Sequence, residues 1–275
     1  MDHVLSTYLF VNHRLTAAVL DRIYKAGVPA VEIFCAKQHL DYTSRSQVRE
    51  LGFWFRDSQL QVHSLHAPMF NDDVWGRSGP HAVLTITEPS KPRRTAMVDE
   101  IKRAIEIAET IPFQFLIQHI GVSGEEYDER KLEAAMISLE ELRIFAKQRG
   151  VDILVENIPN ALSSAERLHA FLEISHLGLG YCFDTGHAHM NEGVDAAFEM
   201  MAARIRSTHV HDNDGKEDLH HFPYRGGGNI PWKRVMELFR TRPGQFPLVL
   251  ELAEIPDLAQ PLDAVREVFE RLENE

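Results

Sequence analysis

Short apolar runs alternate with amphipathic segments along the whole chain. Strand-like runs, apolar at nearly every position, are predicted near residues 4–11, 29–34, 60–66, 114–119, 151–156, 178–184, 205–211 and 246–252. Helical periodicity is predicted near residues 14–26, 43–58, 93–110, 129–149, 163–174, 194–202, 231–241 and 259–273. Eight strand-then-helix units, with no linker between them, predict one (β/α)₈ TIM barrel domain over residues 1–275.

A doubly wound open sheet is the competing architecture, but it would gather ligands at a single crevice. Here nearly every strand from the second onward ends in a polar functional group, as at the mouth of a barrel.

Two connections, 67–92 and 212–230, exceed ordinary loop length. We expect both to cover one substrate pocket, with Met69, Phe70 and Trp75 excluding water.

The composition of the chain limits the classes of partner that we expect it to bind. The formal charge of −12, from 41 acidic and 29 basic residues, disfavours a polynucleotide substrate, although a local basic groove would be compatible with one. No apolar run reaches membrane-spanning length and no basic segment follows Met1, so we expect a cytoplasmic protein without a membrane partner. Cys35 and Cys182 lie in apolar strands and are expected to be reduced, buried thiols.

The strand ends carry the candidate chemistry. A strand buried on both faces does not accommodate a charged or imidazole group without a partner, so several such groups indicate a shared metal ion. The strand-end candidates are His66, His119, Glu156, Asp184, His209 and Glu251. Each has an alternative reading, because a carboxylate can pair with an arginine and a lone histidine is often a hydrogen-bonded core residue.

Histidines are dense in the segment after residue 209. In a strand His209 and His211 point the same way, and the pair Asp218 and His220 can add an oxygen and a nitrogen ligand. A solvent-exposed polar loop is the alternative reading. His187 follows Asp184 by one helical turn, so Asp184 can both cap that helix and share a metal with His187.

Several short motifs together resemble one superfamily. They are His66-Ala67-Pro68, Gln118-His119, Val155-Glu156-Asn157, Phe183-Asp184-Thr185-Gly186-His187, His209 through Asp212, Asp218-Leu219-His220 with Gly226-Gly227-Gly228-Asn229-Ile230, and Leu250-Glu251. The combined pattern resembles the xylose-isomerase-like TIM barrels, which include sugar isomerases and epimerases and the apurinic endonucleases of the endonuclease IV type.

The resemblance implies roles for individual residues. The single-metal epimerases bind one divalent ion through two glutamates, an aspartate and a histidine, which implies Glu156, Asp184, His209 and Glu251, with both glutamates also acting as acid and base. The endonucleases bind three ions, and the matching additional ligands here are His66, His119, His187, Asp218 and His220. We expect His211, Arg225 and Glu32 to contact the substrate.

Departures from the endonuclease pattern favour the sugar-active branch. Gly227 replaces the glutamate of the Gly-Glu-Gly motif, the loop is two residues longer and includes Arg225, and Gly186 precedes His187 where a cysteine is usual. Our primary hypothesis is therefore an isomerase or epimerase of a small polyhydroxylated substrate such as a sugar or sugar phosphate. One to three divalent ions, Mn²⁺, Zn²⁺ or similar, would stabilise an enediolate during proton transfer.

Two other functions stay open. The first is a phosphodiesterase or apurinic endonuclease that uses three metal ions, which the full set of ligands supports. The second is a catalytically silent binding barrel, which would have no reason to retain so many ligands. A homo-oligomer is compatible with either.

Overall fold

The computed structural model describes residues 1–275 and contains one sheet of eight parallel strands. They are β1 (His3–Ser6), β2 (Ala30–Phe34), β3 (Gln61–His66), β4 (Phe115–His119), β5 (Asp152–Glu156), β6 (Gly180–Asp184), β7 (Ile205–His209) and β8 (Leu248–Leu250). Their spatial order, β7-β6-β5-β4-β3-β2-β1-β8, follows the chain. Backbone hydrogen bonds from Val210 to Val249 (2.8 Å) and from Glu251 to Val210 (3.3 Å) join β7 to β8. The predicted barrel is confirmed.

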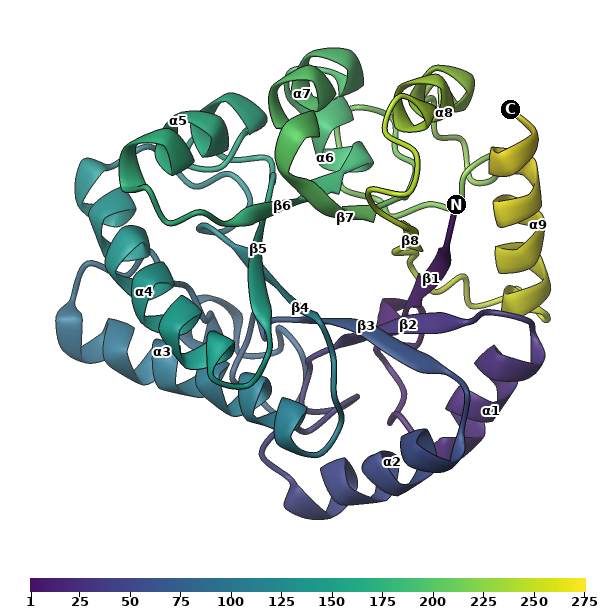
Figure 1. Ribbon diagram of the computed structural model, residues 1–275, viewed down its shortest axis with the longest axis horizontal. Coiled ribbons are helices and arrows are strands. Elements are labelled where there is room, and N and C mark those ends of the chain that lie inside the picture. Colours follow the sequence, from purple (N-terminus) through teal and green to yellow (C-terminus); the bar gives the residue numbers. More distant parts are fainter.

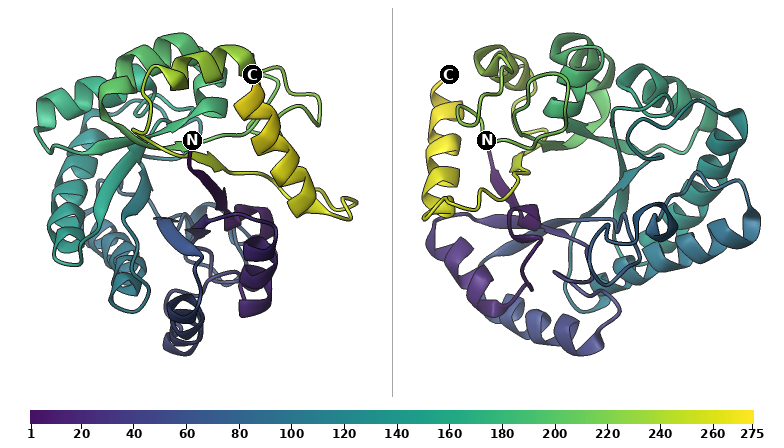
Figure 2. Two further views of the ribbon diagram at one scale, coloured as in Figure 1. Left: turned by 45° about the vertical axis from the view of Figure 1, so that its right-hand side comes forward. Right: turned by 180° about the vertical axis from the view of Figure 1, so that it is seen from behind.

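Helices surround the strands (Figure 1). They are α1 (Ala17–Lys25), α2 (Arg45–Asp57), α3 (Lys91–Ile105), α4 (Glu129–Lys147), α5 (Ala165–Ser175), α6 (Thr185–Met190), α7 (Val194–Met201), α8 (Trp232–Arg240) and α9 (Pro261–Asn274). The two other orientations show the same ring of helices, with α9 beside the N-terminal strand (Figure 2). The helices bury their apolar faces against the strands in one continuous core. None of them is long and apolar enough to cross a membrane.

Three boundaries differ from the prediction. The strand expected at 4–11 ends at Ser6, because its hydroxyl accepts a hydrogen bond from Tyr8 N and the chain turns into a 3₁₀ helix. The helix expected at 93–110 is α-helical only to Ile105 and continues as a 3₁₀ turn. The strand expected at 246–252 is shorter and spans only Leu248–Leu250. Helix α6 is the helix that Asp184 was expected to cap.

Each of the two long connections is held by an antiparallel bridge within the connection. The segment after β3 is held by an antiparallel bridge between Phe70 and Val83, and the segment after β7 by one between Asp212 and His221. The Asp212 carboxylate also accepts from Trp232 Nε1 (2.9 Å) and the Ile230 amide (3.1 Å). A Cβ on Gly228 would lie 2.1 Å from Asp212 Cγ, so only glycine fits there.

Apolar residues fill the barrel interior beneath the strand ends. Phe115 and Ile117 share the inward face of β4 with His119, and they pack with Leu154 of β5 and Cys182 of β6. Cys182 and Cys35 are both free and fully buried, as expected. The strand ends therefore project from a buried floor, where interactions between charges are stronger than in water.

Candidate metal centre

One inner ligand group, defined as Glu156, Asp184, His209 and Glu251, comes from the ends of β5, β6 and β7 and the residue after β8. Their ligand atoms lie within 4.8 Å of one another, and all four residues are buried. His209 Nδ1 lies 3.2 Å from Glu156 Oε1, 3.3 Å from Glu251 Oε2 and 3.8 Å from Asp184 Oδ2. Ligand atoms about 2.0–2.2 Å from a tetrahedral zinc ion lie about 3.3–3.6 Å apart, so this spacing suits one ion.

A β3–β4 ligand group, defined as His66, His119 and Glu156, lies beside the first and shares Glu156 with it. His66 Nδ1 donates to the Ala67 carbonyl oxygen (2.9 Å), which leaves the lone pair on its Nε2. That atom lies 3.2 Å from His119 Nε2, which in turn lies 3.1 Å from Glu156 Oε2. The three donor atoms therefore converge on one point.

An outer ligand group, defined as His187, His211, Asp218 and His220, lies on α6 and the connection after β7. His187 Nδ1 donates to the Asn157 carbonyl oxygen (2.9 Å), and His220 Nδ1 donates to a backbone carbonyl oxygen in the same way (3.0 Å). Both Nε2 lone pairs then face the Asp218 carboxylate, at 3.1 and 3.2 Å. Acceptors that face each other repel unless a cation or proton lies between them.

Buried polar atoms without a hydrogen-bond partner also indicate a place for a cation in the inner ligand group. Glu156 Oε1, His209 Nδ1 and Glu251 Oε1 are buried without a hydrogen-bond partner. Leaving one such atom unsatisfied costs roughly 1–3 kcal/mol, and a bound cation would remove that cost. Imidazole nitrogens and carboxylate oxygens are the donors that Zn²⁺, Mn²⁺ and similar ions accept. The residues present therefore fit a divalent ion.

The surroundings shift the pKa values of Glu156 and Glu251 in opposite directions. Burial raises the pKa of Glu251 to about 8, although His209 and His220 oppose the shift. Burial also acts to raise the pKa of Glu156, but the nearby His209 and His119 outweigh it and hold that pKa well below the usual value. Carboxyl groups whose pKa values are driven apart are suited to separate acid and base roles.

A cavity of about 130 Å³ opens onto the three groups. Tyr8, Phe34 and Trp75 form an aromatic wall, with ring centroids 5.0–5.8 Å apart. Met69 and Trp75 come from the first long connection, and Asp218 and His220 come from the second, so both segments line this cavity as predicted. Phe70 packs behind Trp75, with 5.7 Å between the ring centroids. No lysine or arginine lines the cavity.

All nine expected metal ligands lie in these groups, but the three expected substrate contacts do not line the cavity. Arg225 points to the protein surface and pairs with Glu267. Glu32 is fully buried, with His209 between it and the ion position. His211 is also fully buried, and its Nε2 lies 3.1 Å from Asp184 Oδ2. The sequence places these residues near the mouth, but packing decides where each side chain points.

Two residues at the centre had no predicted role. Asn157 binds the backbone of Asp184 from both sides, accepting from its amide (2.8 Å) and donating to its carbonyl oxygen (2.9 Å). Tyr8 contributes to the aromatic wall and contacts His220, with 5.0 Å between the ring centroids and the rings tilted by 52°. An amide side chain directly after a strand-end ligand is the signal that could have indicated Asn157, whereas Tyr8 lies within the run 4–11 that was expected to be a strand.

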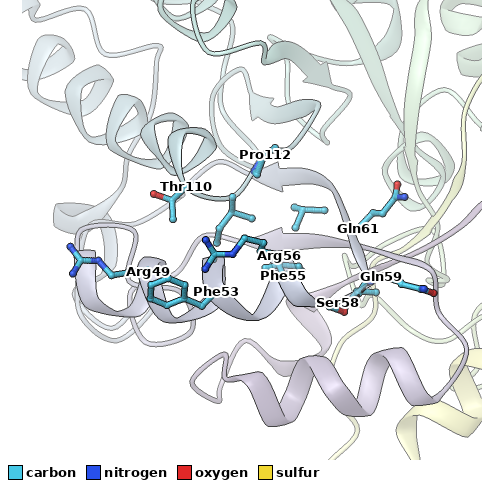
Figure 3. Close-up of a pocket in the computed structure, with 13 residues that line it drawn as sticks. Arg49, Phe53, Phe55, Arg56, Ser58, Gln59, Gln61, Thr110 and Pro112 are labelled. Atoms are coloured by element: carbon cyan, nitrogen blue, oxygen red, sulfur yellow. Dashed lines mark hydrogen bonds between the residues drawn. The ribbon is translucent and has the colours of Figure 1, made fainter.

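A larger cavity, of about 930 Å³, lies elsewhere, on the outside of the barrel. It runs between α2 and the segment leading into β4, with Arg49, Phe53 and Arg56 on one side and Thr110 and Pro112 on the other (Figure 3). Its lining contains no carboxylate and no histidine. It therefore offers neither metal ligands nor an acid and base pair, in contrast to the small cavity at the strand ends.

Comparison with known proteins supports this architecture. An uncharacterized protein of Methanocaldococcus jannaschii is 29% identical over 178 residues, covering 64% of this chain and 70% of that protein. Among solved structures, a D-tagatose 3-epimerase-like protein is 25% identical, with a TM-score of 0.76 and coverage of 100% of this chain and 99% of that one.

Two further structures are more distant in sequence and show the same fold. The IolI protein with a bound zinc atom is 15% identical, with a TM-score of 0.77 and coverage of 99% and 98% of the two chains. A D-psicose 3-epimerase crystallised with D-fructose is 12% identical, with a TM-score of 0.75 and coverage of 98% of each chain. The model of the family called xylose isomerase-like TIM barrel matches residues 20–274, and the chain belongs to that family.

Proposed function

We propose that the protein is a divalent-metal-dependent isomerase or epimerase of a small sugar. One observation carries the proposal: two glutamates, Glu156 and Glu251, border the same ion position from strands that lie three apart around the barrel. A substrate between them would have a carboxylate on each side. The likeness to a D-tagatose 3-epimerase-like protein and a D-psicose 3-epimerase supports this reading.

The inner ligand group would hold the ion. A divalent ion bound there supplies a Lewis acid that polarises a carbonyl group and neutralises negative charge developing on oxygen. Asp184 and His209 are held in place, because Asp184 caps α6 by accepting from the His187 amide (2.6 Å) and His209 is fully buried. These two residues therefore act as fixed ligands.

Glu156 and Glu251 would move the proton. Glu251 Oε2 faces His209 Nδ1 at 3.3 Å, while its Oε1 has no hydrogen-bond partner and is available to substrate, and Glu156 lines the same cavity. One glutamate removes the proton on the carbon next to the carbonyl, and the other returns a proton from the opposite side. Return to the same carbon inverts a stereocentre. Return to the former carbonyl carbon, with the hydroxyl proton of the deprotonated carbon passing to the former carbonyl oxygen, moves the carbonyl group.

The cavity favours an uncharged sugar over a sugar phosphate. A phosphate would need a cationic partner, and no lysine or arginine lines the cavity. The aromatic wall of Tyr8, Phe34 and Trp75 offers apolar surface to the C–H face of a sugar. His187, His119 and Ser123 line the same cavity and can bond hydroxyl groups.

A phosphodiesterase is the second candidate, favoured by the β3–β4 and outer ligand groups. If both hold ions, the cavity would contain enough positive charge to bind a phosphate without lysine or arginine. The two candidates therefore differ in the number of ions that the active protein needs.

A paired activity screen tests the proposal. Protein loaded with Mn²⁺ or Zn²⁺ would be incubated with a panel of unphosphorylated ketoses, with the corresponding sugar phosphates, and with abasic DNA. Chromatography should detect a new epimer or isomer from at least one free ketose. Cleavage of the DNA with no change in any sugar would overturn the proposal in favour of the second candidate.

A further inference from the structure

A buried carboxylate lies behind the histidine of the inner ligand group. Glu32 on β2 is completely buried, and its two oxygens lie 3.1 and 3.2 Å from His209 Nε2. The hydroxyl of Ser64 on β3 donates to the same carboxylate at 2.7 Å. Glu32 therefore joins β2 and β3 to β7 across the barrel interior.

This contact determines which nitrogen of His209 carries the proton. A carboxylate only accepts hydrogen bonds, so the nitrogen that faces Glu32, Nε2, must be the donor. In the neutral ring the lone pair then lies on Nδ1. That atom faces Glu156, Asp184 and Glu251 and has no hydrogen-bond partner. The required tautomer is the one that can bind a metal ion.

Glu32 itself cannot act as a ligand or as a substrate group. The imidazole ring of His209 separates its oxygens from the inner ligand group, and Glu32 does not line the cavity. No lysine or arginine hydrogen-bonds to it. A buried carboxylate needs a positive partner, which a protonated His209 ring provides when no ion is bound and which an ion on Nδ1 would provide through the neutral ring.

We propose that Glu32 is a positioning residue that fixes the tautomer and orientation of His209 and strengthens its bond to the ion. The inference rests on the proposed metal site, but not on the reaction that the ion supports. A carboxylate behind a ligand histidine raises the basicity of the ring, and removal of such a partner typically weakens metal binding by about 10–100-fold.

Zinc affinity of the metal-free protein tests the role. We expect Glu32→Gln to bind Zn²⁺ about 10–100-fold more weakly than the wild type, because an amide of the same size carries no charge. Competition with a chromophoric chelator would measure the affinity. Glu100→Gln is the matched control, because Glu100 is also largely buried but bonds Tyr42 and Arg103 far from the ions. Its Zn²⁺ affinity should equal that of the wild type.

A second measurement does not depend on the variant folding. In the zinc-loaded wild type, ¹⁵N NMR of the imidazoles should show the His209 proton on Nε2. A folded Glu32→Gln with wild-type affinity, or a His209 proton on Nδ1, would overturn the inference. If the affinity falls as expected but no sugar is converted by the wild type, the isomerase proposal fails while the role of Glu32 stands.

Discussion

The inner and outer ligand groups contain similar side chains but are built differently. The inner group comes from the ends of four neighbouring strands, and all of its members are buried. The outer group depends on the connection after β7, where a third of the Asp218 side chain is exposed and His220 has a φ of +47°. A non-glycine residue in this left-handed region of backbone conformation is strained, and its conformation persists only because surrounding contacts hold it.

The difference separates two kinds of metal site. Ligands on strand ends are positioned by the sheet before any ion arrives, so little order has to be gained on binding. Ligands on a loop must be ordered by the loop or by the ion itself. We therefore expect the inner group to bind its ion more tightly, and we expect proton transfer to require only that ion.

The largest effect should come from Glu156, because it belongs to both the inner and the β3–β4 groups. Glu156→Gln should lower kcat for the sugar by roughly 10²–10⁴-fold, the usual contribution of an acid or base, and should also reduce the bound metal. Turnover and elemental analysis would measure both. Glu166→Gln, on the exposed face of α5, is the control. Wild-type turnover in Glu156→Gln would refute the acid and base assignment.

A change in the outer group distinguishes the two candidate functions. Asp218→Asn should release the outer ion but leave the inner ion and most sugar turnover, within roughly tenfold of wild type, because the proton transfer is assigned to the inner group alone. His66→Ala and His119→Ala should likewise release the β3–β4 ion and retain the inner ion and most sugar turnover. Glu217→Gln, an exposed neighbour in the same loop, is the control for Asp218. Cleavage of abasic DNA by the wild type that is lost in all three variants, together with their bound metal, would favour a hydrolytic cluster.

A change that weakens the packing of the connection after β7 should lower metal affinity only in the outer ligand group. Asp212→Asn removes an acceptor from Trp232 Nε1, so the free energy of unfolding should fall by roughly 1–3 kcal/mol. Zinc titration should then show weaker binding at the outer site and unchanged binding at the inner one. Equal weakening at both sites would show that the inner group also depends on this loop. Denaturant unfolding and the titration together provide the check.

The smallest effect concerns a buried histidine outside every ligand group. Burial lowers the pKa of His39 to about 4, below its usual 6.5. As the pH falls, His39 therefore binds a proton in the unfolded state before it does so in the folded state. The contribution of neutral His39 to the free energy of unfolding is complete above pH 6.5 and is lost as the pH falls toward 4. The loss should be about 1 kcal/mol between pH 7 and pH 5.5. It should disappear in His39→Gln but persist in His169→Gln, a change at an exposed position, when unfolding is followed at both pH values.

The sequence predicts the fold better than it predicts the contacts. Eight apolar runs and their strand-end ligands determine the barrel and bring together residues as distant as His66 and Glu251, because parallel strands end at one edge. The direction of a side chain in a loop depends on packing that no periodicity encodes. Arg225 therefore points away from the cavity. Glu32 shows the same limit within a strand, since the sequence places it on β2 but does not reveal that His209 covers it.

The most direct test measures transfer of a solvent proton together with metal content. Metal-loaded protein would be incubated in D₂O with the ketose that it converts, and mass spectrometry and NMR would locate deuterium in the sugar. The account predicts deuterium on the carbon next to the carbonyl, its loss after chelation, and its recovery when about one ion per chain is restored. Sugar conversion that persists in the chelated protein, or hydrolysis of phosphodiesters that appears only at three ions per chain with no deuterium in any sugar, would contradict it.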